Sequence, residues 1–263
     1  SHGNIVANMQ QISAWMKPRL IEKEETVITA LPLYHIFALT VNCLAMMKIG
    51  AHNVLITNPR DMPTFCKTLK KHPFSVFTGV NTLFNGLLNQ ESFRSLDFSS
   101  LKIAVAGGMA LQSFVAKRWK EVTGVAISEG YGLTETSPVV TCNPIDGTER
   151  LGTIGIPLPN TDVKIVDDEG NDLPLGERGE LCVKGPQVMP GYWERPEETA
   201  DSFLGEWFKT GDIAVKDKDG YFKIVDRKKE MILVSGFNVY PNEVEDALTA
   251  HDRINEAGVI GIP

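Results

Sequence analysis

The chain has 263 residues, which is enough for one large domain or for two smaller domains with cores of their own. Hydrophobic residues make up 43% and charged residues 22%, a balance that is typical of globular proteins and excludes a disordered or fibrous chain. The 26 basic and 33 acidic residues give a net charge of -7. They form no long block of one sign, so the composition argues against nucleic acid as a partner.

The cysteines and the apolar segments indicate which compartment and which kind of protein to expect. The four cysteines are Cys43, Cys66, Cys142 and Cys182. They lie far apart and form no CxxC pair, which predicts packed, reduced thiols in a reducing compartment and gives little support to a zinc site or a disulfide framework. The first ten residues lack the charged start and apolar run of a secretory signal. The most apolar window, residues 36–50, contains Asn42 and Lys48 and falls short of the ~20 apolar residues of a membrane span, which predicts a buried helix.

Strands and helices alternate over the first 124 residues. Short apolar runs predict strands at 27–32, 52–57, 74–80 and 101–108. Periodic segments between them predict helices at 4–17 (starting at or before residue 1), 36–49, 62–72 and 111–124. This alternation predicts an α/β fold with a parallel-type sheet flanked by helices.

The pattern changes after residue 150. Short alternating segments joined by Asp and Gly turns predict strands at 161–170, 176–185 and 219–227, and therefore a β-rich subdomain. Beyond Arg227 the sequence predicts a strand at 231–236 and a capped helix at 242–251. We expect three parts, residues 1–150, 151–226 and 227–263.

Glycines follow the fourth predicted strand in the segment AVAGG, residues 104–108. Ligands of open α/β sheets collect beyond the carboxyl ends of the strands, and glycines there let a ring or a phosphate approach the backbone. A plain turn is the more frequent explanation of such a glycine pair taken alone.

The segment SEGYGLTETSP, residues 128–138, is too polar for a core strand and lacks helical periodicity, so we expect it to bury little. Its glycines can expose backbone N–H groups, and Thr134 and Thr136 offer hydroxyls to phosphate oxygens. Glu135 is a hard oxygen ligand of the kind that Mg²⁺ prefers beside a nucleotide, and the ring of Tyr131 can lie against a purine. A solvated loop with capping hydroxyls explains the composition equally well.

A third candidate region follows residue 207. Asp212 comes after Gly211 in a tight turn, a common way to aim a carboxylate at two ribose hydroxyls. Asp226 and Arg227 lie where the composition changes, as residues of a hinge between subdomains would. The basic triplet at 227–229 is by itself more typical of a solvated face than of a site.

Taken together, six motifs in order resemble the adenylate-forming (AMP-binding) superfamily: LPLYHIF, AGG, EGYGLTETSP, GELCVKGP, WFKTGD and DGYFKIVDRKKEMILVSGFNVYPNEVE. The long last motif, with NPRD and FTGVNTLFN upstream, is most similar to bacterial long-chain fatty acid–CoA ligases. The resemblance covers essentially the whole chain. It implies an acyl-CoA synthetase-like fold in which residues 227–263 begin a small α+β C-terminal lid.

The resemblance also implies a reaction in two steps. A fatty carboxylate attacks the α-phosphate of Mg·ATP to give an acyl-adenylate and pyrophosphate, and the thiol of coenzyme A then attacks the acyl carbon and releases AMP. Residues that match the family's motifs acquire roles. Those near the adenine and the acyl-adenylate linkage are Gly108, Glu129, Gly130, Tyr131 and Gly132. Thr134 would hold the α-phosphate, Glu135 the Mg²⁺ ion, and His35 would lie near the acyl carbonyl.

In the second half of the chain, the resemblance assigns Asp212 to the ribose hydroxyls, with Arg227 close by. It makes Asp226 the hinge of the lid and brings Lys229 towards the nucleotide. Gly236 and Asn238 would line the channel for coenzyme A.

Two family features have no counterpart in the sequence: the Gly/Ser/Thr-rich phosphate loop with its lysine, and the late Gly-Lys motif. We therefore expect a central fragment of a ligase that is nearly inactive by itself, because each missing lysine acts on charge that develops in the first step.

Other readings stay open. Within the superfamily they are an aryl or medium-chain CoA ligase and an adenylation domain that loads a carrier protein; outside it, a non-catalytic AMP-binding module. The resemblance implies a cytoplasmic protein, and it leaves open peripheral association with the inner face of the cytoplasmic membrane and pairing into a homodimer.

Overall fold

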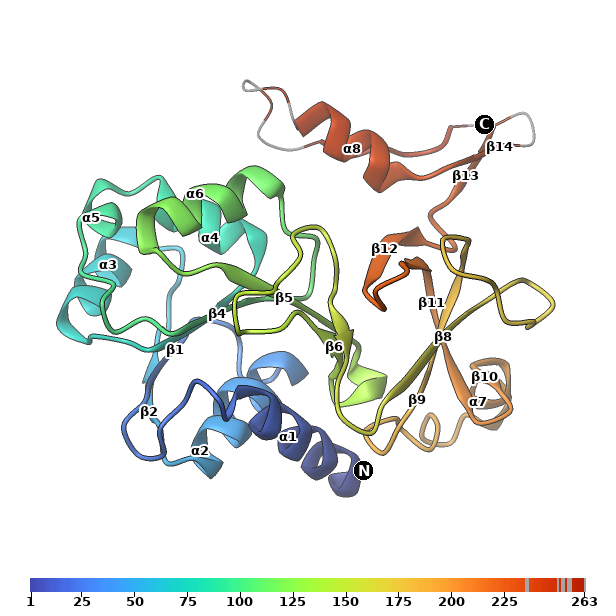
Figure 1. Ribbon diagram of the computed structural model, residues 1–263, viewed down its shortest axis with the longest axis horizontal. Helices are drawn as coiled ribbons and strands as arrows, with labels where there is room; N and C mark the ends of the chain where they lie inside the picture. The colour runs from blue at the N-terminus through green and yellow to red at the C-terminus, as the bar shows by residue number, and fades with distance from the viewer. Residues whose placement is uncertain (235–236, 250, 252–253, 255–256, 263) are drawn as a thin grey trace. The chain divides into compact units, whose positions relative to one another are not determined.

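The computed structural model describes residues 1–234, 237–249, 251, 254 and 257–262 (Figure 1). The chain forms two compact units. Unit 1 comprises Ser1–Thr161 with Gly185–Pro190, and unit 2 comprises Asp162–Lys184 with Gly191–Pro263. The predicted division into three parts remains a prediction.

Unit 1 is built on a sheet in the order β2-β1-β3-β4-β5-β6-β7. Its strands are β1 (Thr26–Thr29), β2 (His52–Leu55), β3 (Val76–Gly79), β4 (Ile103–Ala106), β5 (Ile127–Gly132), β6 (Val139–Cys142) and β7 (Ile156–Pro157). The pairs among β1 to β5 are parallel, and β6 and β7 continue the sheet antiparallel. The short apolar runs predicted β1 to β4 correctly, since a strand covered on both faces is apolar along its whole length.

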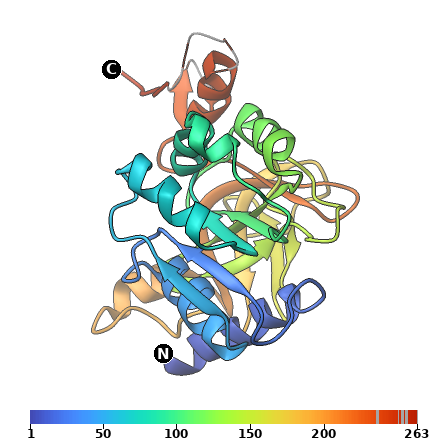
Figure 2. The same ribbon diagram turned by 90° about the vertical axis from the view of Figure 1, so that its left-hand side faces the viewer.

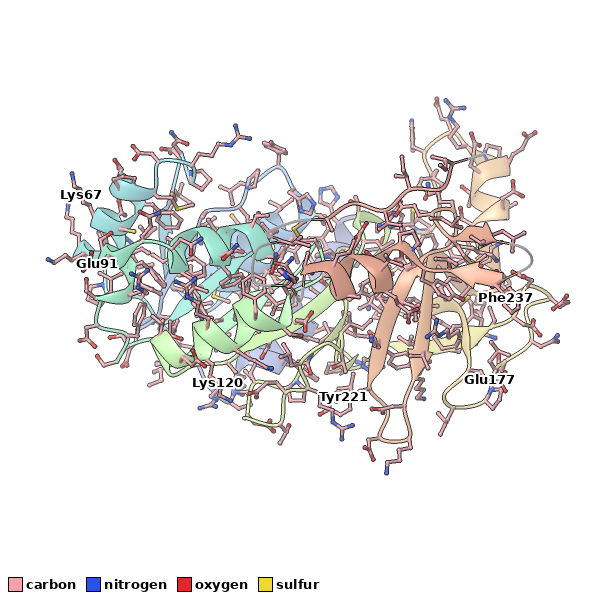
Figure 3. The ribbon with its side chains drawn as sticks, turned by 90° about the horizontal axis from the view of Figure 1, so that it is seen from above. Lys67, Glu91, Lys120, Glu177, Tyr221 and Phe237 are labelled. Carbon is pink, nitrogen blue, oxygen red and sulfur yellow. The ribbon has the colours of Figure 1, made fainter. Side chains whose placement is uncertain are left out.

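Helices cover both faces of this sheet (Figures 1 and 2). They are α1 (His2–Met16), η1 (Ala38–Ala45), α2 (Met46–Lys48), α3 (Met62–Lys71), α4 (Asn81–Leu88), α5 (Glu91–Arg94) and α6 (Ser113–Thr123). Alternate strand residues face two separate cores: Ile28 and Phe77 pack under α3 to α6, whereas Val27 and Val76 pack under α1, η1 and α2. Charged side chains such as Lys67, Glu91 and Lys120 lie on the outer side of the helices (Figure 3).

Between β3 and β4 the sequence prediction missed helices α4 and α5, and it did not foresee the geometry of the helix at 36–49. Helices α4 and α5 follow β3 directly, and their combined pattern is broken by Gly86 and by Asn89-Gln90, so no single periodic segment marks them. The helix expected at 36–49 is present, but Ala38–Ala45 forms a π-helix.

The polar residue inside that apolar helix is buried and paired. The side-chain amide of Asn42 donates to the hydroxyl of Thr78 at 2.7 Å and to that of Thr29 at 3.1 Å, and Thr78 donates back to the Oδ1 atom of Asn42 at 3.0 Å. A buried amide is tolerated where each group has a partner, so Asn42 fastens η1 to strands β1 and β3.

Unit 2 is rich in β-structure. Its strands are β8 (Asp162–Val166), β9 (Arg178–Lys184), β10 (Phe203–Leu204), β11 (Trp207–Lys216) and β12 (Phe222–Arg227), in one antiparallel sheet. Helix α7 (Pro196–Asp201) precedes β10. The hairpin of β13 (Ile232–Val234) and β14 (Phe237–Val239) leads to helix α8 (Pro241–Thr249). The α/β class with a parallel-rich, helix-flanked sheet and a β-rich part is confirmed.

No helix in the described part of the chain is long and apolar enough to cross a membrane. All four cysteines are free; Cys66, Cys142 and Cys182 are buried, and Cys43 is partly exposed. This agrees with the prediction of packed, reduced thiols.

Trp119 is the centre of the core beneath α3 to α6. Its ring is fully buried and packs against Phe77, Phe84 and Phe93 at centroid distances of 5.4, 4.8 and 5.3 Å. We expect Trp119→Ala to lower the free energy of unfolding by about 3–5 kcal/mol, through lost burial and an unfilled cavity, in urea denaturation followed by circular dichroism. The control, Trp193→Ala, removes an 88% exposed indole and should cost less than about 0.5 kcal/mol. Equal losses in the two variants would contradict this account of the core.

The thiols should differ sharply in reactivity. Burial raises the pKa of Cys142 to about 12 and that of Cys182 to about 11, so neither forms a reactive thiolate near neutral pH. With a disulfide reagent at about pH 8, we expect only Cys43 to react rapidly in the folded chain. The three buried thiols should react after denaturation. Rapid labelling of Cys142 in the native chain would show that the core around it opens.

Candidate functional site

In unit 1, predicted site residues lie at the carboxyl end of β4 and on β5. Ala106 is in register with Glu129 of the parallel strand β5, so Gly107 and Gly108 continue directly beside β5. A Cβ atom on Gly107 would lie 3.2 Å from the carbonyl oxygen of Gly130 and 3.3 Å from the ring of Phe37. Gly108 has a φ of +82°, which a residue with a side chain resists. Close approach and backbone angle therefore account for this glycine pair.

The polar segment that follows differs from the expectation. Ile127–Gly132 forms strand β5, and Thr134–Thr136 forms the short helix η2. The prediction that residues 128–138 bury little is wrong, because Ser128, Glu129, Thr136 and Ser137 are all buried. Polarity misled the prediction, because these polar groups have hydrogen-bond partners inside the protein instead of being exposed to water.

The side chain of Glu129 supports a neighbouring turn. One of its carboxylate oxygens accepts from the backbone N–H of Gly152 at 3.0 Å, and its backbone carbonyl accepts from the N–H of Asn143 at 2.8 Å. Glu129 thus links β5 to the loops on either side of residue 150.

Two further glycines bring the backbone of β5 close to its antiparallel neighbour. Gly130 pairs with Cys142, and the register shifts between Tyr131 and Gly132. A Cβ atom on Gly132 would overlap the carbonyl of Pro138, so this position requires glycine. The shift ends the regular ladder where η2 begins and turns the chain at Thr134.

The three residues of η2 differ in accessibility. The side chain of Thr134 is exposed and that of Glu135 is partly buried. The backbone carbonyl of Glu135 accepts from the N–H of Met189 at 2.7 Å, which holds the turn from a distant segment of unit 1. Thr136 is fully buried and its hydroxyl bonds to the backbone of Leu133 and Pro138, so its prediction as a phosphate donor is wrong.

His35 lies at the start of the helical segment that packs on the sheet. Its side chain is exposed, and its Nδ1 atom accepts from the N–H of Phe37 at 3.2 Å. Since the ring of Phe37 packs against Gly107, His35 is tied to the same edge of the sheet as β4 and β5.

A separate group of predicted residues lies on β11 and β12 of unit 2. Asp212 is in register with Arg227, and the Nε atom of Arg227 lies 3.2 Å from a carboxylate oxygen of Asp212. The side chain of Asp212 is 4% exposed, whereas that of Arg227 is 53% exposed. The predicted proximity of Asp212 and Arg227 is therefore present.

Asp226 is fully buried and faces helix α8. One carboxylate oxygen accepts from the backbone N–H of Asn242 at 3.0 Å, and the other accepts from the side-chain amide of Asn242 at 3.2 Å and from the N–H of Arg227 at 2.7 Å. Asp226 caps the first turn of α8 from outside the helix. The sequence prediction missed Asn242, because its partner lies 16 residues earlier.

The remaining predicted residues lie near β13 and β14. Lys229 and Asn238 are exposed, and Asn238 pairs with Leu233 in the hairpin. Gly236 lies outside the described residues.

The residues present fit a metal that is shared with a nucleotide. Within the described ranges, no group of three or more His, Cys, Asp and Glu side chains could hold a metal ion by itself. Mg²⁺ in nucleotide sites is often held by one or two carboxylates together with substrate phosphates, and a partly buried Glu135 beside an exposed Thr134 matches that donor set.

Comparison with known proteins identifies the family of the chain. The family described as AMP-binding enzyme matches residues 1–193. The chain is 55% identical over its whole length to the long-chain-fatty-acid–CoA ligase of Escherichia coli O6:H1 and 40% identical to that of Bacillus subtilis. It covers 47% of each, so the chain spans about half the length of the curated relatives that it matches.

Solved structures show the same fold. ATP-bound MatB from Rhodopseudomonas palustris superimposes with a TM-score of 0.89 at 31% identity, over 100% of this chain and 51% of that one. The anthranilate CoA ligase AuaEII in complex with anthranoyl-AMP gives a TM-score of 0.88 at 30% identity, over 97% of this chain and 50% of that one. The family match over residues 1–193 shows that the chain belongs to the AMP-binding enzyme family.

Proposed function

We propose that the chain is part of a long-chain fatty acid–CoA ligase. In the first step a fatty carboxylate oxygen attacks the α-phosphorus of ATP and pyrophosphate leaves, giving acyl-AMP. In the second step the sulfur of coenzyme A attacks the acyl carbon, and AMP leaves with the bonding electrons. The observation that carries the proposal is the 55% identity to curated ligases of this class along all 263 residues.

The β5–η2 segment of unit 1 would bind the nucleotide. The backbone at Gly108, which has a positive φ, and the residues Glu129 to Gly132 of β5 are proposed to border the adenine and the acyl-adenylate linkage. The exposed hydroxyl of Thr134 would donate to the α-phosphate, where negative charge grows as the carboxylate attacks.

Glu135 would hold Mg²⁺, which neutralises phosphate charge when it is bound. The Glu135 backbone is already fixed by its bond to Met189, so the carboxylate needs little reorganisation. His35 is proposed to lie near the acyl carbonyl.

Asp212 of unit 2 would accept hydrogen bonds from the two ribose hydroxyls. Its carboxylate is buried and is oriented by Arg227, so it is held in one position before the ligand arrives. We propose that Lys229 approaches the nucleotide. The channel for coenzyme A would be lined by Gly236 and Asn238.

Fatty acids partition into membranes, so the proposal includes a cytoplasmic enzyme that meets its substrate at the inner face of the membrane. ATP, Mg²⁺ and coenzyme A would be supplied from the same compartment.

Thermal melting tests the proposal directly. A ligand that binds only the folded chain must raise its melting temperature. We expect a non-hydrolysable long-chain acyl-adenylate to raise it clearly, an aryl analogue to raise it less, and Asp212→Ala to reduce both shifts. A cooperative melt that no adenylate shifts would contradict a nucleotide site in this chain, and a larger shift with the aryl analogue would contradict the long-chain assignment.

The proposed hinge makes a separate prediction. Replacing Asp226 by Ala removes the acceptor for the Asn242 N–H, and loss of such a cap costs about 1–2 kcal/mol. We expect the amides in the first turn of α8 to exchange with deuterium at least about fivefold faster, measured by NMR. The matched control, Asp97→Ala, removes an exposed carboxylate in unit 1 and should leave α8 unchanged. Unaltered exchange at Asn242 in Asp226→Ala would show that the cap does not stabilise the helix.

A further inference from the structure

A β-bulge interrupts strand β11 at the turn that carries Asp212. Against β9, Lys209 pairs with Cys182 and the next registered pair is Ile213 with Glu180. Three residues of β11, Thr210 to Asp212, therefore lie opposite Leu181 alone. Bulges re-aim side chains, and they leave backbone groups without their ladder partners.

A side chain of β9 replaces one of these lost partners. One carboxylate oxygen of Glu180 accepts from the N–H of Gly211 at 3.1 Å. Gly211 has a φ of +73°, so its peptide is turned out of the strand geometry. An N–H left unpaired at such a partly buried position would be costly, which makes the carboxylate a structural requirement of this turn.

The other groups of the turn are fixed in the same way. The hydroxyl of Thr210 donates to the carbonyl of Leu181 at 2.8 Å and accepts from the N–H of Asp212 at 3.1 Å. The carbonyl of Gly211 accepts from the N–H of Lys228 at 2.9 Å. The backbone around Asp212 is therefore held on both sides of its peptide.

Lys228 joins these groups through its side chain. Its Nζ atom lies 3.0 Å from the second carboxylate oxygen of Glu180 and 2.8 Å from Asp168. The two partners differ in environment, because the side chain of Glu180 is 10% exposed and that of Asp168 is 82% exposed. Asp168 and, after it, Glu180 raise the pKa of Lys228, so the lysine remains charged beside the buried carboxylate.

We infer that Glu180 is a positioning residue for the Asp212 carboxylate. It fills the bulge, fixes the Gly211 peptide and, with Lys228, sets the direction in which Asp212 leaves the strand. Glu180 itself need not touch the nucleotide. The inference rests on the proposed function in one respect, the binding of ribose hydroxyls by Asp212.

The experiment compares four forms of the chain, the wild type and the variants Glu180→Ala, Glu180→Gln and Asp168→Asn. Amide exchange at Gly211 and Asp212 is measured by NMR, and the dissociation constants of AMP and 2′,3′-dideoxy-AMP are measured by calorimetry. The dideoxy nucleotide lacks both hydroxyls that Asp212 would bind, so it separates a displaced Asp212 from a general loss of structure.

We expect Glu180→Ala to speed amide exchange at Gly211 at least about tenfold and to raise the dissociation constant of AMP about tenfold. This is the effect expected from losing one well-placed charged contact. Binding of the dideoxy nucleotide should stay unchanged. Glu180→Gln keeps an oxygen acceptor for the Gly211 N–H and should restore most of the protection. Asp168→Asn removes the exposed partner of the same lysine and should behave as the wild type.

Two outcomes would overturn the inference. Unchanged exchange at Gly211 in Glu180→Ala would mean that the carboxylate does not hold the turn. If Glu180→Ala raised the dissociation constants of AMP and of the dideoxy nucleotide equally, Glu180 would have a general structural role. If the wild type binds neither nucleotide, the proposed function fails for this chain, and the exchange rates at Gly211 and Asp212 then decide by themselves whether Glu180 fixes the turn.

Discussion

Burying a polar group is costly unless it finds a hydrogen-bond partner, and this constraint shapes the candidate segments of each unit. In unit 1, strand β5 carries Ser128 and Glu129 into the protein, and Glu129 is satisfied by the backbone of Gly152. In unit 2, the bulge in β11 turns Gly211 out of the ladder, and Glu180 takes its N–H. In both places a carboxylate accepts a hydrogen bond from a backbone N–H, and this bond fixes the segment that carries a candidate side chain.

The apolar frame of the protein was predictable from the sequence. Runs such as IAVA at β4 can be buried on both faces of a parallel sheet, and the helix ending at Gly124 has the glycine in the left-handed conformation that such an end requires. These features depend on neighbours in the sequence, so local patterns reveal them.

The features that were missed depend on distant partners. Strand β5 is polar, and its acceptance into the sheet depends on Asn143 and Gly152 beyond the next strand. The sequence suggested that the hydroxyl of Thr136 is available to a ligand, but this hydroxyl bonds to the backbone of Leu133 within the same turn. The candidate residues Asp212 and Arg227 were found through their motifs, whereas Glu180 and Asn242 were not singled out, since each acts through a residue 31 or 16 positions away.

The cap that Asp226 places on α8 has a consequence for any motion at this point of the chain. The carboxylate binds both the backbone and the side chain of Asn242, so turning the chain at residue 226 and uncapping the helix are one event. Two arrangements of the chain about residue 226 would then differ in population by the strength of this cap, and a change of about 1.4 kcal/mol would shift their ratio tenfold. A substitution at position 242, which is not among the predicted site residues, can thereby adjust that ratio.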